Sequence, residues 1–149
     1  MKIQHSIVAL AIAATLSAPA SAQFKNDEHA VKYRQSAFTA MGVHFGRIGA
    51  MANGKMAFDA ATAKRDAQAV ALLSTLPWMG FTEGSEGISD KAKPEIWMEM
   101  NKFKDKAQAM QEKTAALSVA AQSGDLDRIK AAFGATAKSC KACHDAYKN

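Results

Sequence analysis

The sequence predicts an all-α protein, an antiparallel four-helix bundle with up-down-up-down topology. Apolar residues recur at intervals of three and four positions along four segments of the chain, a spacing that places them on one face of a helix. No segment shows the strict alternation of apolar and polar residues that is typical of a half-buried strand. Most connections between the four segments are short, which favours antiparallel packing of consecutive helices.

The first helix is expected to begin near Asn26 or Asp27, either of which can cap it, and to run to about Ala50. Gly49 and the sequence NGK at 53–55 indicate its end. The apolar face of this helix comprises Val31, Phe38, Met41, Phe45 and Ile48.

The second helix is expected to follow Asp59, a good N-cap residue, and to stop before Pro77. Its apolar positions are Ala63, Ala67, Val70 and Leu73. The Gly-rich sequence PWMGFTEGSEGISDKAK at 77–93 follows, and it is the only long irregular connection that the pattern predicts. Long loops in compact domains often serve a functional site.

The third helix is expected to open at Pro94, where the missing N–H costs nothing, and to run to about Ser123. Its apolar positions are Ile96, Trp97, Met100, Phe103, Ala107, Met110, Leu117 and Val119. Asp125 is expected to cap the fourth helix, which runs close to the C-terminus. That helix presents Leu126, Ile129, Phe133, Thr136, Ala137 and Cys140.

The first 22 residues have the pattern of a secretory signal peptide. Lys2 precedes an apolar run at 7–16, and Ala20, Ser21 and Ala22 form a small-residue cleavage site. We expect cleavage after Ala22, which leaves residues 23–149 as a single exported domain; the alternative is a retained N-terminal amphipathic anchor. The expected mature chain keeps 18 of the 19 basic residues and all 14 acidic residues, a net charge of +4. Because these charges are interspersed and lack interleaved aromatic residues, they do not indicate a nucleic-acid surface.

The two cysteines of the chain lie in the sequence SCKACHDAY at 139–147, on the predicted fourth helix. The spacing of Cys140, Cys143 and His144 places the three side chains on one helical face. A thioredoxin-type redox pair usually follows a strand, a zinc site needs a fourth ligand, and a disulfide across three helical residues is strained. The sequence CKACH instead matches the C-x-x-C-H haem attachment motif. It predicts one haem c per chain, with thioethers to Cys140 and Cys143 and with His144 as the axial iron ligand.

Four stretches of the sequence resemble the cytochrome c′ family, whose members are four-helix bundles. They are HAVKYRQSAFTAMGVHFGRI, LSTLPWMGF, KPEIW and KAAFGATAKSCKACHDAYK, and the resemblance extends over residues 23–149. It implies a periplasmic haem protein in which Arg34 contacts a haem propionate and Gln35 follows it. It further implies that Trp78 lies beside the haem edge and that Phe38 occupies the distal position over the iron.

The resemblance gives the distal position its functional meaning. Low-spin relatives with the same bundle carry a methionine there, whereas the ring of Phe38 has no lone pair to donate. The resemblance therefore implies a five-coordinate haem that binds nitric oxide and carbon monoxide, and that acts in nitric oxide sequestration or transport rather than as an enzyme. The alternative is plain one-electron transfer with an unknown redox partner. Met41 is a competing sixth ligand, although it lies nearly one turn further along the helix; His44 is farther still, and His29 is expected to be solvent-exposed.

Two further expectations come from the resemblance alone. Many family members carry an arginine four residues after the haem histidine, where this chain has Lys148. Lysine lacks the planar fork of arginine, so the proximal role of that residue does not transfer directly. Family members are commonly homodimers through the first two helices, and we expect the same here.

Overall fold

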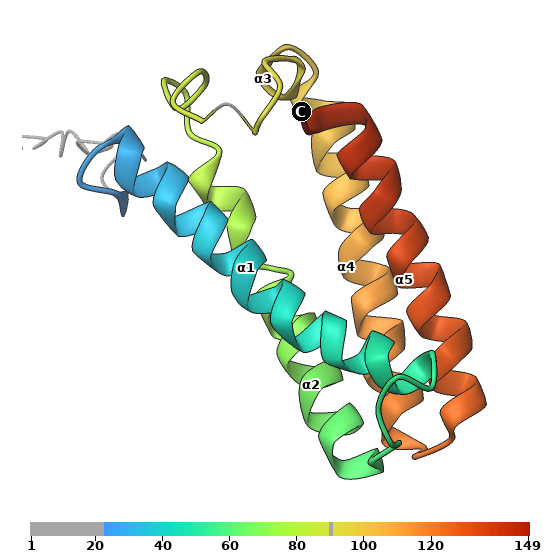
Figure 1. Ribbon diagram of the computed structural model, residues 1–149. Coiled ribbons are helices and arrows are strands. Elements are labelled where there is room, and N and C mark those ends of the chain that lie inside the picture. Colours follow the sequence, from blue (N-terminus) through green and yellow to red (C-terminus); the bar gives the residue numbers. More distant parts are fainter. Residues whose placement is uncertain (1–22, 90) are drawn as a thin grey trace, which may run out of the picture.

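The computed structural model describes residues 23–89 and 91–149; the predicted signal peptide and its cleavage site lie outside these residues. Four long helices form the bundle: α1 (Asp27–Ala52), α2 (Ala60–Leu73), α4 (Met100–Gln122) and α5 (Leu126–Tyr147). A 3₁₀ helix, η2 (Pro77–Gly80), and a one-turn helix, α3 (Glu95–Met98), lie in the connection between α2 and α4. The predicted all-α, antiparallel four-helix bundle is confirmed (Figure 1).

Three of the four predicted helix starts are confirmed by side-chain caps. The Asn26 side chain accepts a hydrogen bond from the backbone N–H of His29 at 3.0 Å. The Asp59 side chain accepts one from Thr62 at 2.6 Å, and the Asp125 side chain accepts from the backbone N–H of Arg128 at 3.2 Å. Each cap satisfies a donor that the first helical turn would otherwise leave unpaired.

The prediction of a single third helix from Pro94 to about Ser123 was wrong. The structure divides it into α3 and α4, and Glu99 between them has φ −122° and ψ 39°, outside the helical range. The change of direction lets Ile96 pack in a cluster with Phe103 and Tyr147. The indole N–H of Trp97 then donates to the Thr82 carbonyl at 3.0 Å, so the break fixes the long loop to the bundle.

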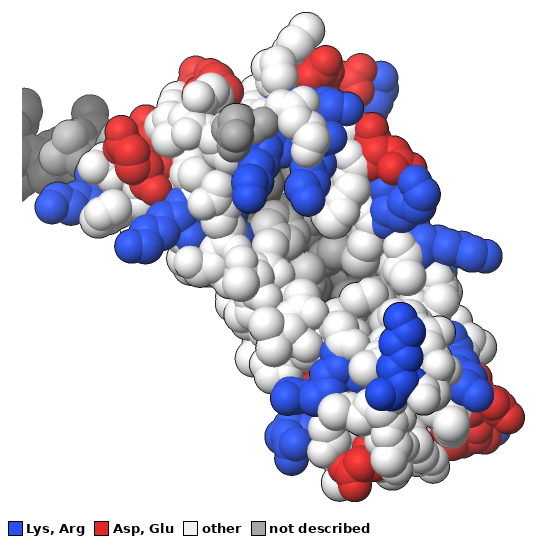
Figure 2. All heavy atoms as spheres, viewed as in Figure 1, with Lys and Arg blue, Asp and Glu red and all other residues white. Residues whose placement is uncertain are grey.

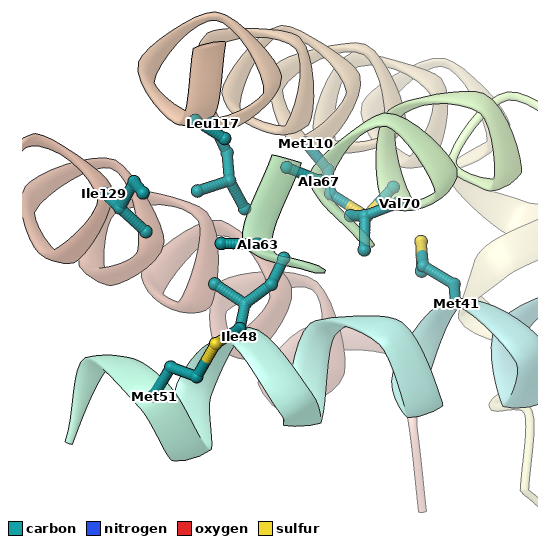
Figure 3. Packing of buried hydrophobic residues seen from close by; sticks show 10 residues of the cluster. Met41, Ile48, Met51, Ala63, Ala67, Val70, Met110, Leu117 and Ile129 are labelled. Atoms are coloured by element: carbon teal, nitrogen blue, oxygen red, sulfur yellow. The ribbon is translucent and has the colours of Figure 1, made fainter. Parts of the chain in front are cut away.

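The main hydrophobic core fills the end of the bundle at which α1 meets α2 and α4 meets α5. Figure 3 shows its side chains converging from all four long helices. The buried members are Met41, Ile48, Met51, Ala63, Ala67, Val70, Met110, Leu117, Ala121 and Ile129. At the other end the pair α1 and α2 diverges from the pair α4 and α5 (Figure 1). No helix in the described part of the chain is long and apolar enough to cross a bilayer.

Candidate functional site

A cavity of about 550 Å³ lies between the two helix pairs, within the size range of cofactor sites. Figure 2 shows the surface hollowed at this place. Its walls come from α1, α2, η2, α3, α4, α5 and the loop residues Phe81, Ser89, Lys91 and Ala92. All seven residues that the sequence analysis assigns to the site line it: Arg34, Gln35, Phe38, Trp78, Cys140, Cys143 and His144.

The cysteines lie half-buried on α5, without a disulfide between them. Burial raises the pKa of both thiols, and nearby Lys106 only partly offsets this at Cys143. Burial therefore disfavours the thiolate form of both side chains. Among the described residues, no group of three His, Cys, Asp or Glu side chains could hold a metal ion.

His144 follows Cys143 on the same face of α5 and lines the same cavity. Partial burial lowers its pKa, and the neighbouring charge of Lys148 lowers it further. At neutral pH the imidazole is therefore uncharged, the form that offers a lone pair to a metal. Lys148 lines the cavity beside it.

Arg34 projects from α1 and is almost completely buried, with 3% of its surface exposed. Its Nη1 donates to the Gly80 carbonyl and to the Ser85 hydroxyl, both at 2.7 Å, and its Nη2 donates to the Ser85 carbonyl at 3.3 Å. The guanidinium also lies 4.5 Å from the centroid of the Phe81 ring. Within residues 23–89 and 91–149 it forms no ion pair with a carboxylate. A guanidinium has five N–H donors, so Arg34 retains capacity for an anionic acceptor in the cavity.

The close approach of η2 to α1 depends on the absence of a side chain at Gly80. A Cβ atom there would lie 2.7 Å from the Ala30 carbonyl oxygen and 2.9 Å from Cβ of Arg34. Glycine therefore lets the chain pass close enough to α1 for its carbonyl to accept the Arg34 hydrogen bond.

We expect Gly80→Ala to lower the free energy of unfolding by about 2 kcal/mol, because the added methyl group forces backbone to move in a packed contact. Urea unfolding measures this change. Gly134→Ala on α5 is the matched control, since no described atom lies within 4 Å of its added Cβ. Equal stability of the two variants would contradict the requirement for glycine at position 80.

Phe38 enters the cavity from α1, within a group of aromatic side chains. The centroid of its ring lies 5.7 Å from that of Trp78 and 6.5 Å from that of Phe81, both in edge-to-face contact. The indole N–H of Trp78 donates to the Ser74 carbonyl at 2.6 Å, which fixes the Trp78 ring. Trp78 also makes edge contact with Phe103 of α4 at 5.6 Å. This wall of the cavity therefore offers rings rather than ligand atoms.

The long loop is held over the cavity by contacts with α1 and with the C-terminal end of α5. The side-chain amide of Gln35 donates to the Ser89 hydroxyl at 3.1 Å. Ala92 and Lys148 form an antiparallel bridge, and the backbone N–H of Lys93 donates to the Tyr147 carbonyl at 3.1 Å. The length of this loop predicts a functional role, but nothing in the sequence predicts that Phe81, Ser89 and Lys91 line the cavity. Gln35 and Ser89, for example, are 54 positions apart in the sequence, so no local signal predicts their contact.

Met41 and His44, the two alternative iron ligands, lie in different surroundings. Met41 is 8% exposed, packs in the main core and also borders the cavity. The His44 imidazole binds the buried carboxylate of Asp66 on α2 at 2.9 Å, so its Nδ1 is engaged outside the cavity. His29 is exposed, as predicted.

Comparison with known proteins agrees with this site. The family profile "Cytochrome C'" matches residues 29–148. The chain belongs to the cytochrome c′ family. Cytochrome c′ of Alcaligenes xylosoxydans xylosoxydans is 50% identical over 126 residues, which cover 85% of this chain and 98% of the relative. Cytochrome c′ of Rubrivivax gelatinosus is 42% identical over 127 residues and covers 85% and 98%.

Solved structures of cytochrome c′ share the fold. Cytochrome c prime from Shewanella frigidimarina superposes with a TM-score of 0.82 at 45% identity, and the match covers 85% of this chain and 98% of that one. A nitric oxide complex of a variant of cytochrome c prime from Alcaligenes xylosoxidans has a TM-score of 0.80 at 50% identity, with the same coverage. Nitric oxide thus binds to a protein of this family with half of its residues identical to those of this chain.

Proteins of the cytochrome c′ family carry haem c, and the residues present here fit that group. The cavity lining is predominantly apolar, as a porphyrin requires, and one wall carries the Cys140, Cys143 and His144 side chains. Arg34 supplies a buried cation without a carboxylate partner in the described part of the chain. A propionate would complete its hydrogen bonds and balance its charge.

Proposed function

We propose that this cytochrome c′ carries one covalent haem c and binds small gaseous ligands, nitric oxide and carbon monoxide, at a five-coordinate iron. The observation that carries the proposal is Phe38. It projects from α1 into the cavity that also contains His144 from α5, and its side chain contains only carbon and hydrogen. The bound haem would supply an iron position that a small neutral diatomic can take.

The chain's own residues have distinct roles in this proposal. Cys140 and Cys143 anchor the porphyrin on α5, and His144 ligates the iron as a neutral imidazole. Arg34 and Gln35 join α1 to the loop that covers the cavity, and Arg34 receives a propionate. Phe38, held by Trp78, excludes water and side-chain ligands from the remaining iron face. The role is ligand sequestration or transport, without a catalytic residue.

The spectrum of the ferric holoprotein tests the proposal. We expect high-spin ferric haem in the optical and electron paramagnetic resonance spectra, and carbon monoxide binding after reduction. Met41→Leu is expected to leave both unchanged, because Met41 packs in the core. A low-spin spectrum typical of histidine–methionine ligation that is lost in Met41→Leu would overturn the five-coordinate proposal. It would favour the second candidate, one-electron transfer.

Two parts of the proposal concern the chain outside its cavity. Residues 1–22 are proposed to direct export to the periplasm, where c-type haem is attached; N-terminal sequencing of the mature protein should begin at Gln23, and a start at Met1 would contradict cleavage. A homodimer through α1 and α2 is supported by exposed apolar side chains, since Val43 is 61% and Leu72 is 67% exposed. Sedimentation equilibrium of Val43→Glu should show weaker dimerisation, and a monomeric unsubstituted protein would contradict the dimer.

A further inference from the structure

The opening of the cavity carries positive charge without a balancing carboxylate. Arg34, Lys91 and Lys148 line the cavity, whereas no Asp or Glu is among its described lining residues. Arg34 is buried, but Lys91 and Lys148 are exposed. Figure 2 shows Lys and Arg side chains bordering the hollow on several sides. The surface around the cavity opening is therefore basic.

Neither exposed lysine is neutralised by a neighbouring carboxylate. Asp145 lies on α5, and both of its carboxylate oxygens accept hydrogen bonds from Nζ of Lys141 at 2.7 Å. In the described part of the chain, Lys91 and Lys148 form no ion pair. Their charges are therefore available to a molecule that approaches the opening.

The haem propionates do not cancel this charge. The haem of the proposed function has two propionates, and Arg34 receives one of them. The second propionate can balance only one of the two exposed lysines. Lys106 on α4 adds a further charge, which acts on Cys143 in the attachment motif, and it too forms no ion pair with a described residue. The cavity opening therefore stays basic in the holoprotein.

An opening of this kind attracts acidic molecules. Its walls are predominantly apolar, and a cleft with low-dielectric walls and charges of one sign focuses the electric field. The field raises the rate at which an oppositely charged molecule meets the opening. The hollow also brings that molecule close to the cofactor, which electron transfer between proteins requires. Reduction is needed for the proposed function, because carbon monoxide binds after the iron becomes ferrous.

We propose that the cavity opening, with Lys91, Lys106 and Lys148, is the docking surface for an acidic protein that donates one electron to the haem. The reduced centre of the donor loses one electron and the ferric iron becomes ferrous, while no covalent bond forms or breaks. Attraction between the charges sets the rate of encounter, and the complex dissociates readily, as weak redox complexes with small interfaces do. The inference rests on the haem of the proposed function and adds to it the chemical class of the reductant.

Stopped-flow reduction of the ferric holoprotein by reduced flavodoxin, an acidic one-electron donor, tests the inference. At low ionic strength, Lys91→Glu is expected to slow reduction by about tenfold and Lys91→Gln by less, because each weakens the attraction. The differences should vanish at about 0.5 M salt, since exposed charges are then screened. Reduction that does not depend on salt would overturn the inference.

Lys55→Glu is the matched control, because it makes the same change of charge away from the opening. Lys55 is exposed and lies in the turn between α1 and α2, outside the cavity lining. Its substitution should slow reduction by flavodoxin by less than about twofold. Equal slowing in Lys91→Glu and Lys55→Glu would overturn the inference, since only the net charge of the protein would then matter.

Photoreduced lumiflavin, an uncharged donor, separates docking from a change in the haem itself. It should reduce the unsubstituted protein and Lys91→Glu at the same rate. Slowing of Lys91→Glu with lumiflavin as well as with flavodoxin would assign the effect to the reduction potential and overturn the inference.

Co-sedimentation with vesicles of phosphatidylglycerol and phosphatidylcholine tests a membrane surface as the occupant instead. Vesicle binding that is lost in Lys91→Glu, together with unchanged reduction by flavodoxin, would overturn the protein partner in favour of an anionic membrane. If flavodoxin reduces the holoprotein as expected but the ferrous form binds no carbon monoxide, the proposed gas binding fails and the docking surface stands. If carbon monoxide binds and reduction does not depend on Lys91, only the inference fails.

Discussion

Phe38→Ala is expected to speed the association of carbon monoxide and nitric oxide with the ferrous holoprotein by about 10- to 100-fold. In the proposed site a ligand would displace the Phe38 ring, which would then lose its edge-to-face contacts with Trp78 and Phe81. Such contacts contribute about 0.5–1.5 kcal/mol each, so removal of both lowers the barrier by about 1–3 kcal/mol. Stopped-flow or flash-photolysis rates measure the change directly.

Phe133→Leu is the control for a general effect of losing an aromatic ring. Phe133 stacks on Phe45 with a centroid distance of 4.5 Å and does not line the cavity. Phe133→Leu is therefore expected to lower stability while it leaves ligand association unchanged. If Phe38→Ala and Phe133→Leu alter the rates equally, Phe38 does not restrict access to the iron.

The fold was predictable to the extent that its signals are local. Asn26, Asp59 and Asp125 cap the helices at the positions where the sequence places them, because a cap needs only the next three residues. The break at Glu99 leaves no such signal. The Glu99 backbone N–H still donates to Glu95 at 2.8 Å, and Phe103 donates to the Glu99 carbonyl at 3.0 Å. The apolar period continues through the break, which is explained by the packing of Ile96 against Phe103 and Tyr147 and by the hydrogen bond from Trp97 to Thr82.

The candidate site was likewise predictable only where its residues are close together in the sequence. Cys140, Cys143 and His144 are adjacent in sequence, so helical spacing alone brings them to one face. The role of Arg34 at the loop depends on Gly80 and Ser85, which are 46 and 51 positions away. The functional meaning of Phe38 came from resemblance, and its ring contacts with Trp78 and Phe81 required the structure. Contacts between residues far apart in the sequence therefore form the rest of the site, which the haem-attachment motif alone does not predict.

Asp66→Ala is expected to lower the free energy of unfolding at pH 7 by about 3 kcal/mol, the low end for loss of one partner from a buried ion pair. Asp66 lies on α2 with no exposed surface and joins it to α1. Its carboxylate accepts from Arg47 at 2.5 and 2.6 Å and binds His44 at 2.9 Å. The loss is at the low end because Arg47 and His44 are only partly buried, with 37% and 32% of their side chains exposed, and water can hydrate them.

The matched control is Asp105→Ala on α4, since Asp105 is exposed. Its removal is expected to change stability little, because surface substitutions away from buried networks usually do. Asp66→Asn keeps the volume and one acceptor, so it should be less destabilising than Asp66→Ala. Equal urea midpoints for the Asp66 and Asp105 alanine variants would contradict a stabilising role for the buried carboxylate.

Acid pH gives this prediction a second, independent readout. Burial alone would raise the pKa of Asp66, but the hydrogen bonds and charges of Arg47 and His44 outweigh it and hold the pKa below its ordinary value. The stabilisation is therefore complete above the unfolded pKa of about 3.9 and is lost as the pH falls toward the lower folded-state pKa. The stability difference between the unsubstituted protein and Asp66→Asn should be constant near neutrality and narrow below about pH 4. A difference that does not change with pH would assign the effect of Asp66 to packing rather than to its charge.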